Sequence, residues 1–280
     1  MDYDLEHTVF SFVPNTAETA FLGLVKGVEK YLNGVKQEKI LKLGKDLKPK
    51  KLEKILAMTP RVEKLVLKDE KLRTFIADDN SRNELVSHVY DVTYGIVQDD
   101  VDTLVLLDDS IVRGTTLRDS LIKIVSRLRP KKIIFVSSAP QIRYPDCYGI
   151  DMSKMKDFVA FQALIQLLKE TKQTGLLKEA YKKCKDQESL PVEQVSNQVA
   201  ALYDRFSYDE ITKRIARIVT PDDIKPEVQV IYQTIEGLHE ACPNNPGDWY
   251  FSGNYPTPGG NRVVNRAFMN YMEDKNERAY

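Results

Sequence analysis

One stretch, Thr103 to Thr116, restricts the fold of this chain more than any other. A mostly apolar run, Thr103–Leu107, ends in two adjacent carboxylates, Asp108 and Asp109. The run lacks the alternation of a strand with one wet face, so it predicts a strand buried on both sides, as in a parallel sheet. Ligands of such sheets bind beyond the carboxyl ends of the strands. The aspartate pair therefore predicts a ligand site at this edge.

The residues after the pair predict an anion-binding turn. Gly114 allows close approach of the backbone to a ligand, and Thr115 and Thr116 stand where a helix cap belongs, before a helical pattern over 117–129. Free N–H groups and the helix dipole favour an anion there, such as a phosphate monoester. The two carboxylates suit vicinal hydroxyls or a hydrated Mg²⁺. The alternative is an ordinary strand-to-helix turn with an Asp cap, which does not account for two Asp, a Gly and two Thr together.

Leu104–Thr116 resembles the signature of type I phosphoribosyltransferases, which bind phosphoribosyl pyrophosphate (PRPP). Ser137–Met152 is similar to one family among them, the glutamine PRPP amidotransferases, which form phosphoribosylamine for purine synthesis. The resemblance covers Thr8–Met152 and returns at Trp249–Thr257. It implies an α/β fold with a mainly parallel twisted sheet flanked by helices.

The pattern along the chain predicts three regions. Residues 1–155 form the phosphoribosyltransferase-like core, 156–240 a helical insertion and 241–280 a tail packed on the core. Within the core we expect strands at 7–13, 62–67 and 130–138 and a helix from about Ala17 to Leu32. An amphipathic, lysine-rich insertion is expected over 33–58.

The resemblance extends to the loops around the site. Asn15 and Thr16 match the family's pyrophosphate loop, where Asn15 replaces a Glu, and Thr16 is also a credible helix cap. Arg73 leads into a mobile loop that is rich in Lys and Arg in the family. Here residues 77–95 offer only Arg82 and His88 as cations. These two residues take over the stabilisation of departing pyrophosphate, or they are surface residues of an inactive loop.

Arg143, after the strand at 130–138, is placed to meet a phosphate or carboxylate; pairing with Asp146 or Asp151 is the structural alternative. The residues predicted for catalysis are Asp108, Asp109, Arg82 and His88; for substrate binding Ser110, Arg113, Gly114, Thr115, Thr116, Asn15, Thr16, Arg73 and Arg143; and for Mg²⁺ Asp108 and Asp109.

The amino-acid composition argues against several classes of function. The 280 residues carry 41 basic and 41 acidic side chains, a balance that points away from nucleic acid and anionic membranes. No signal peptide or membrane-spanning run is evident, so we expect a cytoplasmic enzyme. The three cysteines lack disulfide or Cys-x-x-Cys spacing, so no iron–sulfur cluster is expected, although some members of the family carry one.

The expected reaction is displacement of pyrophosphate from PRPP by ammonia. The first strand is expected so near Met1 that a glutaminase domain does not fit before it. Ammonia is then free or comes from a glutaminase domain or subunit, and the enzyme is a homo-oligomer. The alternatives are a non-catalytic module that binds PRPP or a nucleotide, and a phosphoribosyltransferase with another acceptor.

Overall fold

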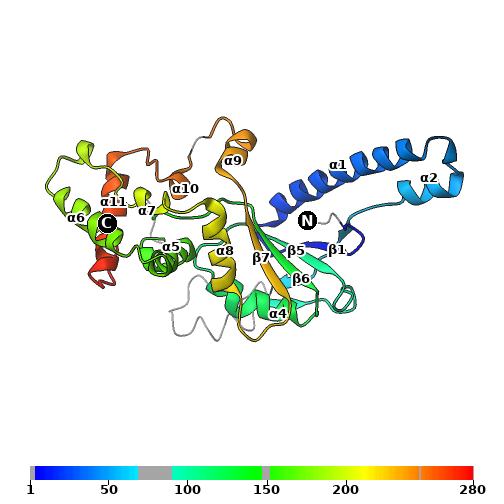
Figure 1. Cartoon of the computed structure of the whole chain (residues 1–280), viewed down its shortest axis with the longest axis horizontal. Coiled ribbons are helices and arrows are strands. Elements are labelled where there is room, and N and C mark those ends of the chain that lie inside the picture. The colour runs from blue at the N-terminus through cyan, green and yellow to red at the C-terminus, as the bar shows by residue number, and fades with distance from the viewer. Residues whose placement is uncertain (1–3, 69–89, 147–151, 246, 280) are drawn as a thin grey trace. The chain divides into compact units, whose positions relative to one another are not determined.

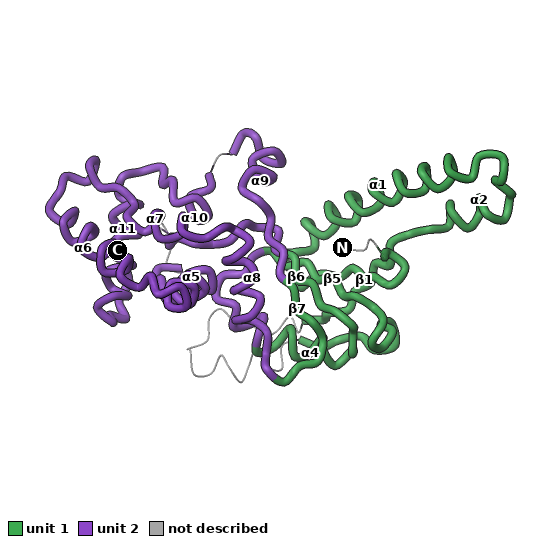
Figure 2. Tube along the Cα trace, viewed as in Figure 1, with its two compact units in different colours: residues 1–109, 119–136, 223–229 green, residues 110–118, 137–222, 230–280 purple. Residues whose placement is uncertain are grey.

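The structure is a computed structural model that describes residues 4–68, 90–146, 152–245 and 247–279. The chain forms two compact units, coloured separately in Figure 2. Unit 1 comprises residues 1–109, 119–136 and 223–229, and unit 2 comprises residues 110–118, 137–222 and 230–280. The chain therefore passes from unit 1 to unit 2 at the carboxyl end of the strand that carries the aspartate pair.

A five-stranded sheet with the order β2-β1-β5-β6-β7 is the framework of unit 1. Strand β1 (Thr8–Phe12) runs parallel to both β2 (Arg61–Val62) and β5 (Thr103–Asp108), with Thr8 opposite Thr103. Its other strands are β6 (Lys132–Ser137) and β7 (Glu227–Tyr232). Leu104 and Leu106 are fully buried. The predicted mainly parallel sheet with a buried central strand is confirmed.

A long helical hairpin follows β1 in unit 1 (Figure 1). Helix α1 (Glu18–Leu43) continues well past the predicted end near Leu32, because no proline or left-handed residue interrupts it before Gly44. A short 3₁₀ turn at Gly44–Asp46 leads to α2 (Pro49–Leu56). Helix α2 is held against α1 by Lys36, whose Nζ donates a hydrogen bond to the Leu56 carbonyl at 3.1 Å.

The single strand expected over 62–67 is divided between two sheets. Its first residues belong to β2, and its last belong to β3 (Val66–Lys68), which pairs antiparallel with β4 (Tyr90–Val92). Between them, the Leu65 amide donates to the Ser11 hydroxyl at 3.0 Å, so the chain leaves the main sheet there. The resulting two-stranded sheet was not predicted.

Helices make up most of unit 2. They are α5 (Val159–Glu170), α6 (Gly175–Asp186), α7 (Ala200–Tyr203), α8 (Tyr208–Val219), α9 (Ile235–Ala241), α10 (Trp249–Ser252) and α11 (Pro258–Met272), with 3₁₀ turns at Met155–Asp157 and Val192–Gln194. Phe161 and Phe268, both fully buried, join α5 to α11 edge to face. The helical insertion predicted over 156–240 also contains the strand β7.

Ser207 starts α8 with a complete capping box: its hydroxyl accepts from the Glu210 amide while the Glu210 carboxylate accepts from the Ser207 amide. This cap fixes where α8 begins, at Tyr208. Among the described residues, no helix combines the length and apolarity needed to cross a membrane.

Candidate functional site

The aspartate pair stands where β5 ends. The Asp109 amide donates to Asp108 Oδ1 at 2.9 Å. Burial, followed by the charge of Asp109 and a side-chain hydrogen bond with it, raises the pKa of Asp108 to about 8. Two such carboxylates do not both ionise readily at neutral pH. The pair therefore favours a ligand that donates hydrogen bonds or carries positive charge.

Thr16, in the segment that follows the neighbouring strand β1, contacts the aspartate pair. Because β1 lies beside β5, the segments after both strands meet: the Val13 amide donates to the Leu107 carbonyl at 2.8 Å. The Thr16 hydroxyl donates to Asp109 Oδ2 at 2.6 Å. The prediction that Thr16 caps the helix is wrong, since α1 begins at Glu18 without a side-chain cap. Its hydroxyl is engaged by Asp109 instead.

The sequence predictions missed two residues beside the pair, Lys68 at the end of β3 and Tyr90 at the start of β4. Burial and the charges of Asp108 and Asp109 raise the pKa of Tyr90 to about 12. The Lys68 charge acts on Asp108 in the opposite direction and lowers its pKa. Lys68 Nζ also lies 5.8 Å from the centroid of the Tyr90 ring. No local motif marks either residue; their antiparallel pairing brings them together.

The turn at 110–118, in unit 2, is shaped by Gly114. Its φ is +75°, and a Cβ there would lie 2.9 Å from Val219 Cγ1 and 3.1 Å from Val159 Cγ2. Conformation and packing within unit 2 thus both require glycine. Helical conformation begins at Thr115, so both threonines lie in the first helical turn rather than at a cap, before the π-helical residues Leu117–Ile122 and α4 (Lys123–Ser126).

Arg113 and Arg143 have different surroundings, although both belong to unit 2. Arg113 Nη2 lies 3.6 Å from Asp157 Oδ2, with both side chains about one-third exposed. Arg143 instead contacts two rings, with its guanidinium carbon 4.9 Å from the Tyr203 centroid and 5.1 Å from that of Tyr208. Among the described residues, Arg143 forms no ion pair with Asp146, whose Oδ1 accepts from the Tyr250 hydroxyl.

Several predicted residues cannot be placed. Arg73, Arg82, His88 and Asp151 lie outside the described residues. Within the described ranges, no group of three or more His, Cys, Asp or Glu side chains is arranged to hold a metal ion. The local contacts of the predicted residues that can be placed form two sets: Asp108, Asp109 and Thr16 in unit 1, and the 110–116 turn and Arg143 in unit 2.

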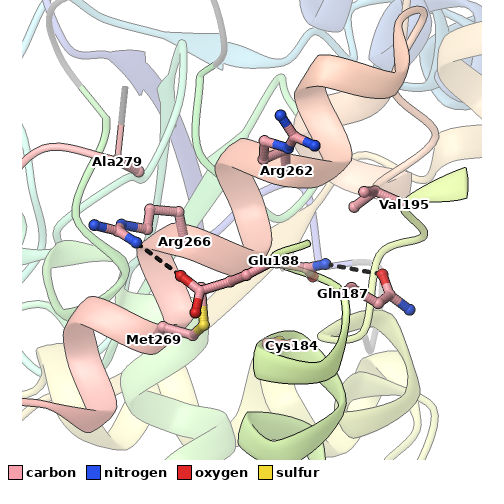
Figure 3. Close-up of a pocket in the computed structure, with 9 residues that line it drawn as sticks. Cys184, Gln187, Glu188, Val195, Arg262, Arg266, Met269 and Ala279 are labelled. Carbon is pink, nitrogen blue, oxygen red and sulfur yellow. Dashed lines mark hydrogen bonds and ion pairs between the residues drawn. The ribbon is translucent and has the colours of Figure 1, made fainter. Parts of the chain in front are cut away.

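A cavity of about 280 Å³ in unit 2 contains none of the predicted residues (Figure 3). It lies between α6 and α11, and an ion pair of 2.9 Å between Arg266 and Glu188 crosses it. Its wall is formed by Cys184, Gln187, Glu188, Val195, Arg262, Asn265, Arg266, Met269 and Ala279. The two arginines of the wall are engaged by Glu188 and by the Leu190 carbonyl, so this cavity is not our candidate site.

Comparison with known proteins supports the resemblance that the motifs predicted. No family model matches the chain. The amidophosphoribosyltransferase of Pasteurella multocida is 47% identical over 58 residues, which are 21% of this chain and 11% of that enzyme. The Saccharomyces cerevisiae enzyme of the same name is 28% identical over 145 residues, 52% of this chain and 25% of the enzyme. The chain thus matches only a minor part of the length of these relatives.

One solved structure aligns with most of the chain at a low TM-score. The Bacillus subtilis glutamine PRPP amidotransferase complexed with ADP and GMP aligns with 91% of this chain and 39% of its own, at 20% identity and a TM-score of 0.47. The resemblance rests on the sequence matches, because several curated relatives carry one name. The predicted resemblance is confirmed: over these segments, the chain is similar to the amidophosphoribosyltransferases.

Proposed function

We propose that the carboxyl end of β5 and the following turn bind PRPP, and that the chain transfers its phosphoribosyl group to ammonia. The observation that carries this proposal is the aspartate pair, with the pKa of Asp108 raised to about 8 and Asp109 held by Thr16 at 2.6 Å. Vicinal ribose hydroxyls supply the hydrogen-bond donors that such a pair favours. The carboxylates also stabilise positive charge that develops on the ribose during substitution.

The neighbouring residues take complementary roles in the proposal. The amides and hydroxyls from Ser110 to Thr116, with Arg113, hold the 5′-phosphate. Asn15 and Thr16 meet the pyrophosphate, as do Arg73 and the cations Arg82 and His88. Lys68, close enough to lower the pKa of Asp108, adds positive charge beside the pair.

Mg²⁺ fits the aspartate pair chemically. Carboxylate oxygens are its preferred ligands, and a divalent cation would offset the cost of ionising both side chains. Asp108 and Asp109 would hold it, together with oxygens of the substrate. When bound, Mg²⁺ neutralises charge on the pyrophosphate leaving group. The chain's own contribution is to orient the sugar and both phosphate groups for attack.

In the proposed reaction, the ammonia lone pair forms the bond to C1 of the ribose while the bond from C1 to the pyrophosphate oxygen breaks. Pyrophosphate leaves with the bonding electrons, and the new ammonium group loses a proton to solvent. No nucleophilic side chain is required. Ammonia is free or comes from a glutaminase domain or subunit, and a cytoplasmic homo-oligomer is part of the same proposal.

One observation favours a second function, a non-catalytic module that binds PRPP. Over residues 77–95, Arg82 and His88 are the only side chains of Lys, Arg or His type. A site that binds the ligand but cannot stabilise departing pyrophosphate would bind without turnover. A phosphoribosyltransferase with another acceptor would differ only in the nucleophile.

Two measurements separate these functions. Calorimetry with PRPP and Mg²⁺ should show binding that is lost in Asp109→Asn and kept in the control Asp100→Asn, whose carboxylate pairs with Lys225. Pyrophosphate release should then require ammonia. Binding of PRPP without release of pyrophosphate, whichever acceptor is supplied, would establish the non-catalytic module. Release of pyrophosphate with purine bases but not with ammonia would establish another acceptor. No binding of PRPP would contradict the whole proposal.

A further inference from the structure

Two aromatic rings contact the guanidinium of Arg143 in unit 2. Tyr203, the last residue of α7, is fully buried, and Tyr208 is the first residue of α8. Their centroids lie 4.9 and 5.1 Å from the guanidinium carbon. Both contacts are of the cation–π type, and the N–H groups lie at the edges of the planar group, where they form hydrogen bonds.

Gln141 occupies one of those edges. Its Oε1 accepts from Arg143 Nε at 3.1 Å and from Nη2 at 2.9 Å. The side-chain amide of Gln141 cannot rotate by half a turn without losing hydrogen bonds, because its Nε2 donates to the Tyr208 carbonyl at 3.0 Å and to the Thr212 hydroxyl at 2.7 Å. That hydroxyl donates in turn to the same carbonyl, so it acts as an acceptor for Gln141. With Gln141 only 1% exposed, the orientation of the guanidinium is fixed.

The opposite edge, formed by Nη1 and the outer N–H of Nη2, remains for a ligand. Among the described residues, no carboxylate lies within ion-pair distance of Arg143. Arginine stays protonated at every physiological pH, so this half-buried charge persists without a counter-ion from the part of the chain that the structure describes. A protein rarely orders such a charge so fully without a partner for it.

We propose that Arg143 is a preformed binding residue for an oxyanion, either a phosphate or a carboxylate group of a small ligand. Two coplanar oxygens match the two parallel N–H groups of the remaining edge. The ligand approaches along the edge formed by Nη1 and Nη2, because Gln141 already occupies the edge formed by Nε and Nη2. This inference does not depend on the aspartate pair, since the contacts that carry it all lie within unit 2.

The test follows the Arg143 side chain by NMR of arginine Nε–Hε groups, with the resonance assigned by its loss in Arg143→Lys. Inorganic phosphate, pyrophosphate and acetate are titrated separately, with chloride for ionic strength. We expect a saturable shift of the Arg143 signal, with phosphate compounds indicating a phosphate ligand and acetate alone a carboxylate ligand. A shift that stays linear with all three anions, as for an exposed arginine, would refute the proposal.

Calorimetry on variants provides the second readout. Arg143→Lys keeps the charge but loses the planar fork, so affinity for the effective anion should fall about tenfold or more. The matched control is Arg262→Lys in α11, whose guanidinium donates to the Leu190 carbonyl, and it should leave affinity unchanged. A purely structural role for Arg143 predicts lower stability in denaturation but equal anion affinity, and that result would also overturn the proposal.

Discussion

The aspartate pair after β5 and Arg143 after β6 meet opposite electrostatic problems in different ways. The pair places two like charges together, and burial, followed by the charge of Asp109, raises the pKa of Asp108 to about 8. Arg143 cannot lose its proton, and two tyrosine rings and a glutamine oxygen stabilise its charge. The first region adapts by protonation and the second by geometry.

This difference indicates which conditions should affect ligand binding in each region. Binding at the pair should depend on pH and on cations, because protons, cations and hydroxyl donors compete for the same oxygens. Binding at Arg143 should depend on the shape of the ligand's charged group and little on pH, except through ionisation of the ligand itself. The predictions below test this contrast, beginning with the largest expected effect.

Removing one charge of the pair should have the largest effect. Asp109→Asn keeps the size of the side chain but removes the carboxylate that accepts from Thr16 and faces the ribose in our proposal. We expect pyrophosphate release with ammonia to fall by about 10²–10³-fold, the range typical of lost electrostatic stabilisation. Asp100→Asn serves as the control. Equal loss in both variants would show that the effect is not specific to the pair.

The pair should also determine part of the pH dependence of stability. A carboxyl group with a raised folded-state pKa binds more protons when folded, so its stabilisation is complete below its unfolded pKa of about 4 and is lost as pH rises toward about 8. Urea denaturation without divalent cations should show unfolding free energy falling across this window, by up to about 1.4 kcal/mol per pH unit.

Asp108→Asn should flatten that slope. The comparison of the two proteins removes the contribution of exposed His7, whose pKa is raised by Asp4 and which acts in the same direction. Glu273 does not interfere: Lys275, Lys185 and Tyr181 lower its pKa to about 2, so its stabilisation is lost only as pH falls below about 4.5. An unchanged slope in Asp108→Asn would mean that the raised pKa is absent in solution.

The turn that follows the pair in sequence depends on shape rather than charge. Gly114→Ala should destabilise the protein by about 1–3 kcal/mol, because φ is +75° and the new methyl would meet Val219 at 2.9 Å. Gly27→Ala is the matched control, since it lies inside α1 with no atom within 4 Å of the new methyl. That control should gain roughly 0.5–1 kcal/mol in urea denaturation. Similar losses in both would contradict the packing described here.

The smallest effect should come from the tyrosine hydroxyl beside Arg143. The Tyr208 hydroxyl accepts from the backbone amide of Gln141 at 2.9 Å and donates to the backbone carbonyl of Gln233 at 3.0 Å. Tyr208→Phe keeps the ring but leaves two polar groups without this partner, so we expect a loss of about 1–2 kcal/mol. Anion affinity should change less than in Arg143→Lys. A larger change would show that the hydroxyl network, rather than the guanidinium edge, controls binding.

Local pattern was sufficient for the centre of the fold. An apolar run without alternation predicted a buried parallel strand, and the structure places β5 beside β1 with Leu104 and Leu106 fully buried. The site at the end of β5 follows from the same rule about strand ends. The assignment of catalytic, substrate-binding and metal-binding roles, and the division into regions at 155 and 240, stay predictions.

Pattern was insufficient where a residue's partner is distant in sequence. Thr16 matched a helix cap by position, but its hydroxyl binds Asp109, 93 residues away. Lys68 and Tyr90 belong to strands too short to show a period, and only their pairing brings them near Asp108. Helix α1 passed its expected end because helices stop at specific residues, and the lysine-rich continuation contains none before Gly44.

The sequence by itself determined the buried strand, the aspartate pair and the turn after it, because each depends on residues close together in the chain. Only the tertiary structure decided the partners of Thr16, the need for glycine at position 114 and the aromatic contacts of Arg143. Those features depend on contacts between segments far apart in sequence, and burial and neighbouring charge, which alter the pKa of Asp108, arise only when such segments pack.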